Sequence, residues 1–224
     1  MSLQQLRQQG HIWQFKQAAK EGETPHPVHA TGFAALDQVI GGWPVQQVTE
    51  IQCLPGIGEL RLLLPYLTRQ QLIQQERWVV FLNCPARLNA VFFVQNGIRL
   101  ERVLEINGSD NEALWAAEQC LKSGCCQSIL LWHNHLQIAQ FKRLQLAAAQ
   151  GQTELFLYRN AVAKQQHLPV SLSLALTGSP NGVVIRVQKK RGGWAGQQLQ
   201  VDWSEQWPQL CQLQPVLPFS ALAG

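Results

Sequence analysis

Charged residues are scarce in this sequence. They make up 14% of its 224 residues, against about 25% in an average soluble domain. Gln accounts for much of the shortfall, so the surface has few repelling charges to hold neighbours apart. We therefore expect the protein to associate with partners or with itself. The formal net charge of +4 is far below the dense positive field of a dedicated nucleic-acid binder.

Long hydrophobic runs are also missing. No apolar stretch approaches the roughly 20 residues that span a bilayer, and residues 1–14 lack the apolar run of a signal peptide. We therefore expect a cytoplasmic protein with no membrane contact. The six cysteines form no C-x-x-C pair, and most lie in apolar runs, which is typical of reduced thiols in a core.

Catalytic constellations are absent as well. No Ser/His/Asp or Cys/His arrangement stands in a recognisable motif, and no carboxylates cluster after the predicted strands. His133 and His135 flank Asn134, but two histidines without further Cys, Asp or Glu nearby are a weak metal signal, and loop polarity explains them better. We expect neither a metal nor a cofactor.

The pattern that is present alternates strands with helices. Residues 48–53, 78–82, 102–106, 128–132 and 153–158 are β-prone apolar runs, and helical segments separate them. Such alternation predicts an α/β fold with a mostly parallel sheet and helices on both faces. After residue 166 strands follow without helices, and Asn181 and Gly182 suit a hairpin turn. Antiparallel strands should extend the sheet at its C-terminal end.

The chain divides into three parts on these grounds. Residues 1–30 read as an N-terminal arm and a linker broken by prolines, residues 31–208 as one core domain, and residues 209–224 as a tail. Trp115 and Trp132 are expected in the core or at its rim. Trp13, Trp194, Trp203 and Trp207 are expected at the periphery, where Trp often anchors an interface.

A glycine turn between the first core strand and the next helix has the context of a phosphate-binding loop but not its chemistry. That loop needs Lys against the phosphates and Ser or Thr against magnesium, and the sequence has Glu59 and Leu60 there. A later strand ends in Trp132 where a magnesium-binding Asp is usual, and Asn83 follows the strand expected to supply the catalytic carboxylate. We therefore expect no nucleotide binding and no enzyme activity. The degenerate site comprises Cys53, Gly56, Gly58, Glu59, Leu60, Asn83 and Trp132.

Several segments resemble known families. Residues 31–51 are similar to the stretch that precedes the nucleotide site of RecA, which implies a RecA-like core. Residues 58–65, 77–82, 113–124 and 141–151 resemble motifs of the SulA and ImuA group. The SulA-like region covers roughly residues 48–176. Similarity to ImuA extends further, to residues 11–14, 31–44 and 185–193, and this wider coverage favours ImuA.

The resemblance to ImuA implies a non-catalytic accessory scaffold of the SOS-induced mutasome, which carries out translesion synthesis after DNA damage. The implied partners are an ImuB-type homologue of Y-family polymerases, an error-prone replicative-type polymerase, RecA and single-stranded DNA. The alternative is a SulA-type inhibitor of cell division, which sequesters the tubulin-like protein FtsZ during the SOS response.

Two further groups of residues are candidate contacts. Lys189, Lys190, Arg191 and Trp194 combine cations with a stacking aromatic, as nucleic-acid contacts do, although short basic runs are more often plain surface. Partner contacts are expected at Trp13 and Phe15 in the arm and at Leu217 and Phe219 in the tail. Leu217 and Phe219 also fit a loose motif of peptides that bind the bacterial sliding clamp. Packing of the tail on its own domain or on a partner is the favoured interpretation.

Overall fold

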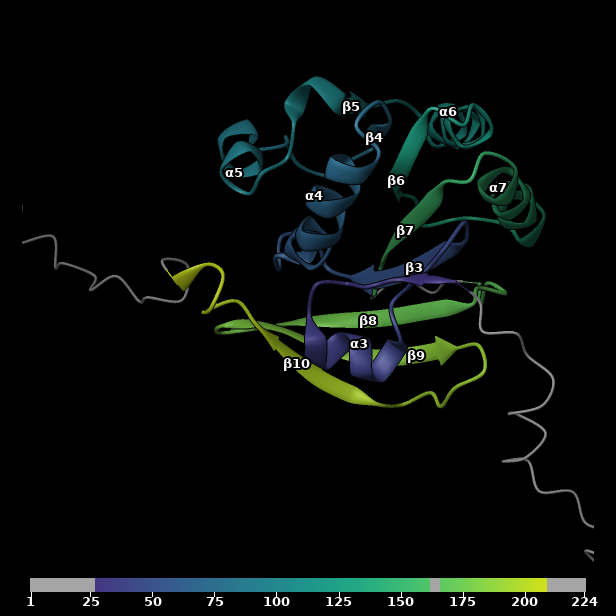
Figure 1. Cartoon of the computed structure of the whole chain (residues 1–224). Helices are drawn as coiled ribbons and strands as arrows, with labels where there is room; N and C mark the ends of the chain where they lie inside the picture. Colours follow the sequence, from purple (N-terminus) through teal and green to yellow (C-terminus); the bar gives the residue numbers. More distant parts are fainter. Residues whose placement is uncertain (1–26, 162–165, 209–224) are drawn as a thin grey trace, which may run out of the picture.

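A mixed eight-stranded sheet forms the centre of the molecule (Figure 1). The computed structural model describes residues 27–161 and 166–208. The strand order is β10-β9-β8-β3-β7-β6-β4-β5, in which β3 to β8 are parallel and β9 is antiparallel to both of its neighbours. The strands are β3 (Val48–Cys53), β4 (Trp78–Leu82), β5 (Val103–Ile106), β6 (Cys126–Trp132), β7 (Glu154–Asn160), β8 (Leu172–Ser179), β9 (Gly182–Lys190) and β10 (Gln198–Asp202).

Helices cover both faces of this sheet, and two separate cores result. One core lies against α3 (Ala34–Ile40), the short η1 (Glu59–Leu62), α4 (Leu64–Ile73) and α5 (Ala90–Gln95). The other lies against α6 (Asp110–Lys122) and α7 (Ile138–Gln150). A short η2 (Leu100–Arg102) leads into β5. Strands buried on both faces have to be apolar throughout, which explains the continuous apolar runs of β4 and β6.

The predicted class, a mainly parallel α/β sheet extended by antiparallel strands, is confirmed at this level. Two details differ. β8 pairs in parallel with β3, so the antiparallel part begins one strand later than expected. Residues 28–29, predicted as linker, form strand β1 (Val28–His29), which pairs with β2 (Trp43–Pro44).

The tryptophans lie differently from the prediction. Trp203 and Trp207, expected at the periphery, are buried, because β10 and the turn after it pack against α3 and α5. Trp115, expected in the core or at its rim, is 66% exposed on α6. Trp194 is 80% exposed, as predicted.

None of the helices within residues 27–161 and 166–208 combines the length and the apolar character that a membrane crossing requires.

Candidate functional site

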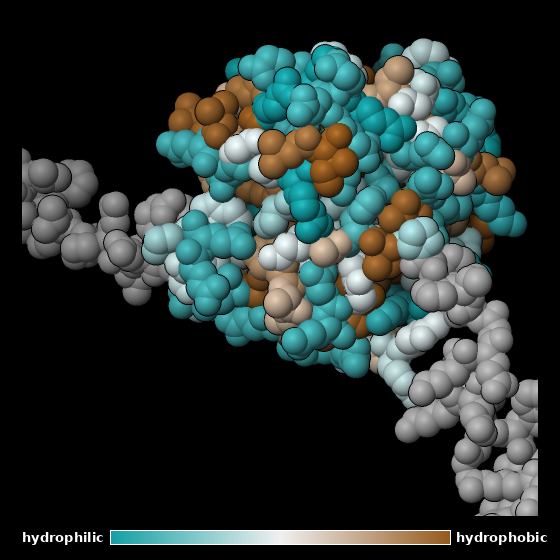
Figure 2. Space-filling view, in the orientation of Figure 1, coloured by the Kyte–Doolittle hydropathy of each residue, from teal (hydrophilic) through white to brown (hydrophobic). Residues whose placement is uncertain are grey.

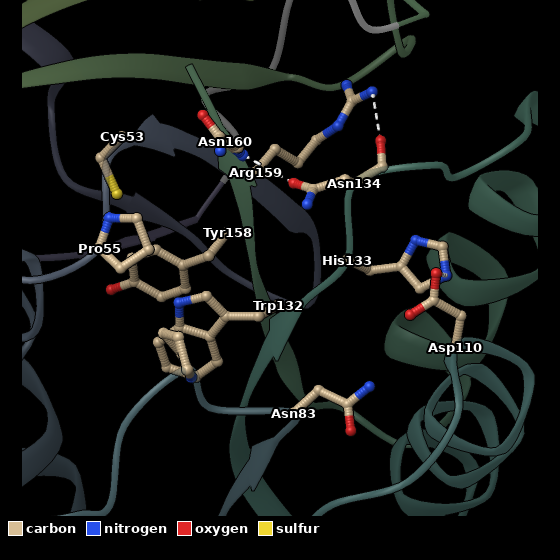
Figure 3. Close-up of a pocket in the computed structure, with 11 residues that line it drawn as sticks. Cys53, Pro55, Asn83, Asp110, Trp132, His133, Asn134, Tyr158, Arg159 and Asn160 are labelled. Carbon is tan, nitrogen blue, oxygen red and sulfur yellow. Dashed lines mark hydrogen bonds and ion pairs between the residues drawn. The ribbon is translucent and has the colours of Figure 1, made fainter. Parts of the chain in front are cut away.

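A pocket of about 260 Å³ opens where β3, β4, β6 and β7 end (Figure 3). Parallel sheets commonly bind ligands outside the carboxyl ends of their strands, because the loops that follow the strands meet there. Three residues of the predicted degenerate site, Cys53, Asn83 and Trp132, come together in its lining. The other lining residues are Pro55, Pro85, Asp110, His133, Asn134, Tyr158, Arg159 and Asn160.

The glycine turn beside the pocket is closed by the side chain of Glu59, the residue that follows it. Gly56 and Gly58 have φ angles of 88° and 90°, in the left-handed region that favours glycine. The Glu59 carboxylate is buried and accepts hydrogen bonds from the Gly56 amide at 3.1 and 3.3 Å. The backbone amide that would donate a hydrogen bond to a phosphate is therefore already bonded to a carboxylate of the chain. Leu60 is half-buried and packs against the core under α4.

The aromatic wall of the pocket is a stacked pair. The Trp132 and Tyr158 rings lie 4.6 Å apart at an interplanar angle of 8° (Figure 3). The Trp132 Nε1 and the Tyr158 hydroxyl are buried and have no hydrogen-bond partner among residues 27–161 and 166–208. Burial raises the pKa of the Tyr158 hydroxyl well above its usual value. Burial, and then the nearby Glu59, raises the pKa of the Cys53 thiol to about 12. Both groups are therefore neutral at pH 7.

The polar side of the pocket mainly holds loops in place. The Asn83 Oδ1 accepts from the Gly108 amide at 2.9 Å, and the Asn134 Oδ1 accepts from the Asn160 amide at 2.8 Å. The His133 Nε2 lies 3.8 Å from the Asp110 Oδ2. Burial lowers the pKa of His133, and this effect exceeds the opposing influence of Asp110. Within the described residues no group of three His, Cys, Asp or Glu side chains is placed to hold a metal ion.

The sequence prediction missed Tyr158, Asp110 and His133 as pocket residues. Tyr158 sits near the end of β7 and His133 directly follows β6, so the position of strand ends was the available signal. Asp110 begins α6, and only the folded chain shows that this helix starts beside His133.

The predicted nucleic-acid contacts do not share one surface. Neighbouring residues of a strand point to opposite faces of a sheet. Lys189 lines a cavity together with Glu50 on one face, whereas the Lys190 Nζ donates to the Val39 carbonyl of α3 on the other face, at 2.9 Å. The Arg191 amide is bonded to the Ser171 carbonyl at 2.7 Å, and Trp194 stands in the turn beyond β9. Trp13, Phe15, Leu217 and Phe219 lie outside the described residues.

An apolar surface covers the neighbouring helices α4 and α5. We call it the α4–α5 surface and define it by Leu72, Ile73, Val91 and Val94, each more than half exposed. The two elements are tied together, because the Thr68 Oγ1 donates to the Asn96 carbonyl at 2.9 Å. Figure 2 shows hydrophobic side chains gathered over these helices. Exposed apolar groups of this kind are typical of protein-binding surfaces.

The fold and these features define a mixed α/β protein with a self-closed glycine turn and an exposed apolar surface on one pair of helices. Residues 42–154, half of the chain, match the family model for the cell division inhibitor SulA. The chain belongs to the SulA family.

Two SulA proteins are similar to this chain. It is 33% identical over 95 residues to the cell division inhibitor SulA of Edwardsiella piscicida, a match that covers 42% of this chain and 56% of that protein. The chain thus spans little more than half the length of this curated relative. The crystal structure of SulA from Pseudomonas aeruginosa superposes with a TM-score of 0.43 at 28% identity, covering 50% of this chain and 97% of that one.

These matches correct the function that we predicted. A mutasome scaffold for translesion synthesis is wrong, because the family model and the curated relative are both SulA, the stated alternative. The predicted partners, an ImuB-type protein, an error-prone polymerase, RecA and single-stranded DNA, are wrong for the same reason. The wider coverage that favoured ImuA rested on three segments. Residues 11–14 lie outside the described part, and in residues 185–193 the strand pleat separates Lys189 from Lys190; the third segment is residues 31–44.

Proposed function

We propose that this protein inhibits cell division by binding the tubulin-like division protein FtsZ, the action that resemblance to SulA implies. The observation that carries the proposal is the match of residues 42–154 to the SulA family model. Inhibition by sequestration needs a binding surface and no reaction. It therefore depends on an exposed patch of the right chemistry and not on the pocket at the strand ends.

The α4–α5 surface is the contact that we propose. Its four apolar residues all lie inside the matched range of 42–154. Burying an exposed Val or Leu side chain against a partner contributes roughly 1.5–3 kcal/mol. A few such residues dominate the affinity of a typical interface. Arg102 pairs with Glu76, three residues after the end of α4, and its guanidinium lies 5.4 Å from the centroid of the Trp78 ring. A charged group in such a position suits the polar rim of an interface.

We also propose that the chain is a non-catalytic, cytoplasmic relative of RecA-type ATPases. Support comes from the central position of β3 in the sheet, from the glycine turn that follows it, and from the helix after that turn. Glu59 satisfies the Gly56 amide, and Leu60 packs into the core, so neither position offers a group to a nucleotide.

The test is expression of the protein in growing rod-shaped bacteria. We expect cells to elongate into filaments whose DNA continues to replicate, and we expect the purified protein to reduce the amount of FtsZ that sediments as polymer with GTP, in proportion to the protein added. Normal division at a confirmed level of folded protein, with unchanged FtsZ sedimentation, would refute the proposal.

A further inference from the structure

The described part of the chain ends against α5, one of the two helices of the α4–α5 surface. Trp207 is buried, its Nε1 donates to the Asn96 Oδ1 at 2.7 Å, and its ring lies 6.4 Å from the Phe92 ring between centroids. Phe92 belongs to α5, and Asn96 directly follows this helix. Figure 1 shows the yellow end of the described chain on the same side of the molecule as α5. The chain beyond the exposed Pro208 therefore continues from a point fixed beside the α4–α5 surface.

The α4–α5 surface itself is apolar and open. Each of its four side chains is more than half exposed, so no segment within residues 27–161 and 166–208 covers it. Apolar side chains in water are stabilised when another apolar group covers them. The surface therefore favours an apolar occupant over a charged one.

The chain beyond Pro208 has the matching chemistry. Residues 209–224 contain no Asp, Glu, Lys or Arg, and their apolar side chains include Leu213, Leu217 and Phe219. The stretch from 209 to 217 can extend to about 30 Å, whereas the six residues of α5 are only about 9 Å long. A segment joined so closely to the domain has an effective concentration on the order of millimolar at a neighbouring site. Reach and local concentration therefore favour this segment over an apolar partner from solution.

We propose that residues 209–224 fold back onto the α4–α5 surface and cover it, with Leu217 and Phe219 as the anchoring side chains. Leu217 precedes Pro218, and a residue before a proline is biased toward an extended backbone. In an extended segment, residues two positions apart point to the same side. Leu217 and Phe219 therefore reach the same apolar surface together.

This cover regulates the contact with FtsZ, a consequence that rests on the proposed function. Residues 209–224 and FtsZ compete for the same four side chains of the α4–α5 surface. When a binding surface is open for only a fraction of the time, the apparent dissociation constant increases by the inverse of that fraction. The cover therefore weakens the inhibition of cell division without abolishing it.

Hydroxyl-radical footprinting of the full-length protein tests the cover, because the oxidation rate of a side chain follows its exposure to solvent. Leu217→Asp with Phe219→Asp should raise the oxidation rates of the four side chains of the α4–α5 surface several-fold. Leu146, exposed on the opposite face, is the internal reference and should keep its rate. Gln212→Asp with Gln214→Asp is the matched control, since it adds the same two charges to the same segment but keeps both anchors. Its footprint should equal that of the native protein.

A reciprocal measurement follows Phe219 in the variant Val91→Asp with Val94→Asp. Charges on α5 remove the apolar surface to which Phe219 binds, so Phe219 should be oxidised several-fold faster than in the native protein. The two pairs of substitutions lie in different parts of the chain. A folding defect in one variant therefore does not account for a changed footprint in both.

Equal oxidation of the α4–α5 surface in the native protein and in Leu217→Asp with Phe219→Asp would overturn the proposal. Protection that increases with protein concentration and persists in this variant would also overturn it, and would assign the surface to a second copy of the chain.

Sedimentation of FtsZ polymer separates this proposal from the proposed function. Leu217→Asp with Phe219→Asp should reduce the sedimented FtsZ at a concentration at least about threefold lower than the native protein requires. If the footprint changes as expected but neither protein affects FtsZ, the proposed function is refuted and the cover is supported. If both proteins affect FtsZ equally and their footprints are the same, the cover is refuted and the proposed function is supported.

Discussion

The Glu59 carboxylate closes the glycine turn by accepting hydrogen bonds from the Gly56 amide, at 3.1 Å to its Oε2 and 3.3 Å to its Oε1. The chain thereby supplies from within the negative charge that such a turn would otherwise take from a phosphate. Burial, and then the same carboxylate, raise the pKa of the Cys53 thiol, so Glu59 acts on both the turn and the end of β3.

Nucleotide binding should be absent for this reason. Titration with a fluorescent ATP analogue and magnesium should show no saturable signal, since a carboxylate about 4 Å from a phosphate charge opposes binding by roughly 4 kcal/mol at an effective dielectric constant near 20. Glu59→Lys combined with Leu60→Thr should still show no turnover, because Asn83 and Trp132 stand where the catalytic and magnesium-binding carboxylates are needed. Micromolar, magnesium-dependent binding by the unmodified protein would show this interpretation of the turn to be wrong.

The α4–α5 surface should carry the division-inhibiting activity. Val91→Asp with Val94→Asp places two charges on the exposed face of α5, which should abolish filamentation and weaken FtsZ binding at least tenfold, an effect of about 1.4 kcal/mol or more. Because both side chains are exposed, the thermal midpoint should change little.

The matched control for this prediction is Leu146→Asp on α7. Leu146 is 71% exposed, similar to the 66% of Val91, but it lies with the helices of the opposite face. It should leave filamentation intact. Equal loss of activity in both variants would show that the contact is not specific to α4 and α5.

How far the sequence predicts this structure depends on the range of the interactions. The strands and helices from β3 to β7 follow from local apolar patterns, and the structure has them within a few residues of the prediction. The burial of Trp203 and Trp207 depends on distant partners: Trp203 packs on Phe33 at 5.7 Å between ring centroids, and the Trp207 Nε1 donates to the Asn96 Oδ1 at 2.7 Å. No local pattern encodes such contacts.

The candidate site shows the same limit. Motif comparison predicted Glu59 and Leu60 as departures from a phosphate-binding loop, but it did not show that Glu59 bonds to Gly56. Nor did it show that Trp132 would stack on Tyr158, because cross-strand neighbours are set by the sheet register. The α4–α5 surface was missed altogether. Its residues follow a normal apolar pattern, and only the folded chain shows that no part of the described chain covers them.

The buried ion pair between Glu50 of β3 and Arg159 of β7 should be important for stability. The Arg159 Nη1 donates to the Glu50 Oε1 at 2.5 Å, the Ser173 Oγ donates to the Glu50 Oε2 at 2.6 Å, and both charged side chains are almost fully buried. Arg159→Met leaves a buried carboxylate without its cation and should lower the free energy of unfolding by about 3–5 kcal/mol in urea titrations.

Arg143→Met is the control for this ion pair. Arg143 also pairs with a glutamate, Glu118, but its side chain is 66% exposed. Solvent screens such a pair, so the loss should be at most about 1 kcal/mol. Equal losses for Arg159→Met and Arg143→Met would contradict a special role for the buried pair.

Stability should also decrease on mild acidification because of His133. Burial lowers the folded-state pKa of His133 below its ordinary value of 6.5, an effect to which His135 and Arg159 add and which Asp110 opposes. Below pH 6.5 the unfolded chain therefore binds a proton that the folded chain does not. The stabilisation is complete above pH 6.5 and is lost as the pH falls from 6.5 toward the folded-state pKa, with a slope of at most about 1.4 kcal/mol per pH unit.

Urea unfolding of the native protein and of His133→Gln between pH 8 and pH 5 measures this contribution. His133→Gln removes the titrating group, so its stability should fall less steeply below pH 6.5. His167→Gln, which changes an exposed histidine that does not act on His133, should keep the native slope. The account of His133 fails if the native protein and His133→Gln lose stability in parallel over this range. A steeper fall in His133→Gln would assign the acid sensitivity to another group.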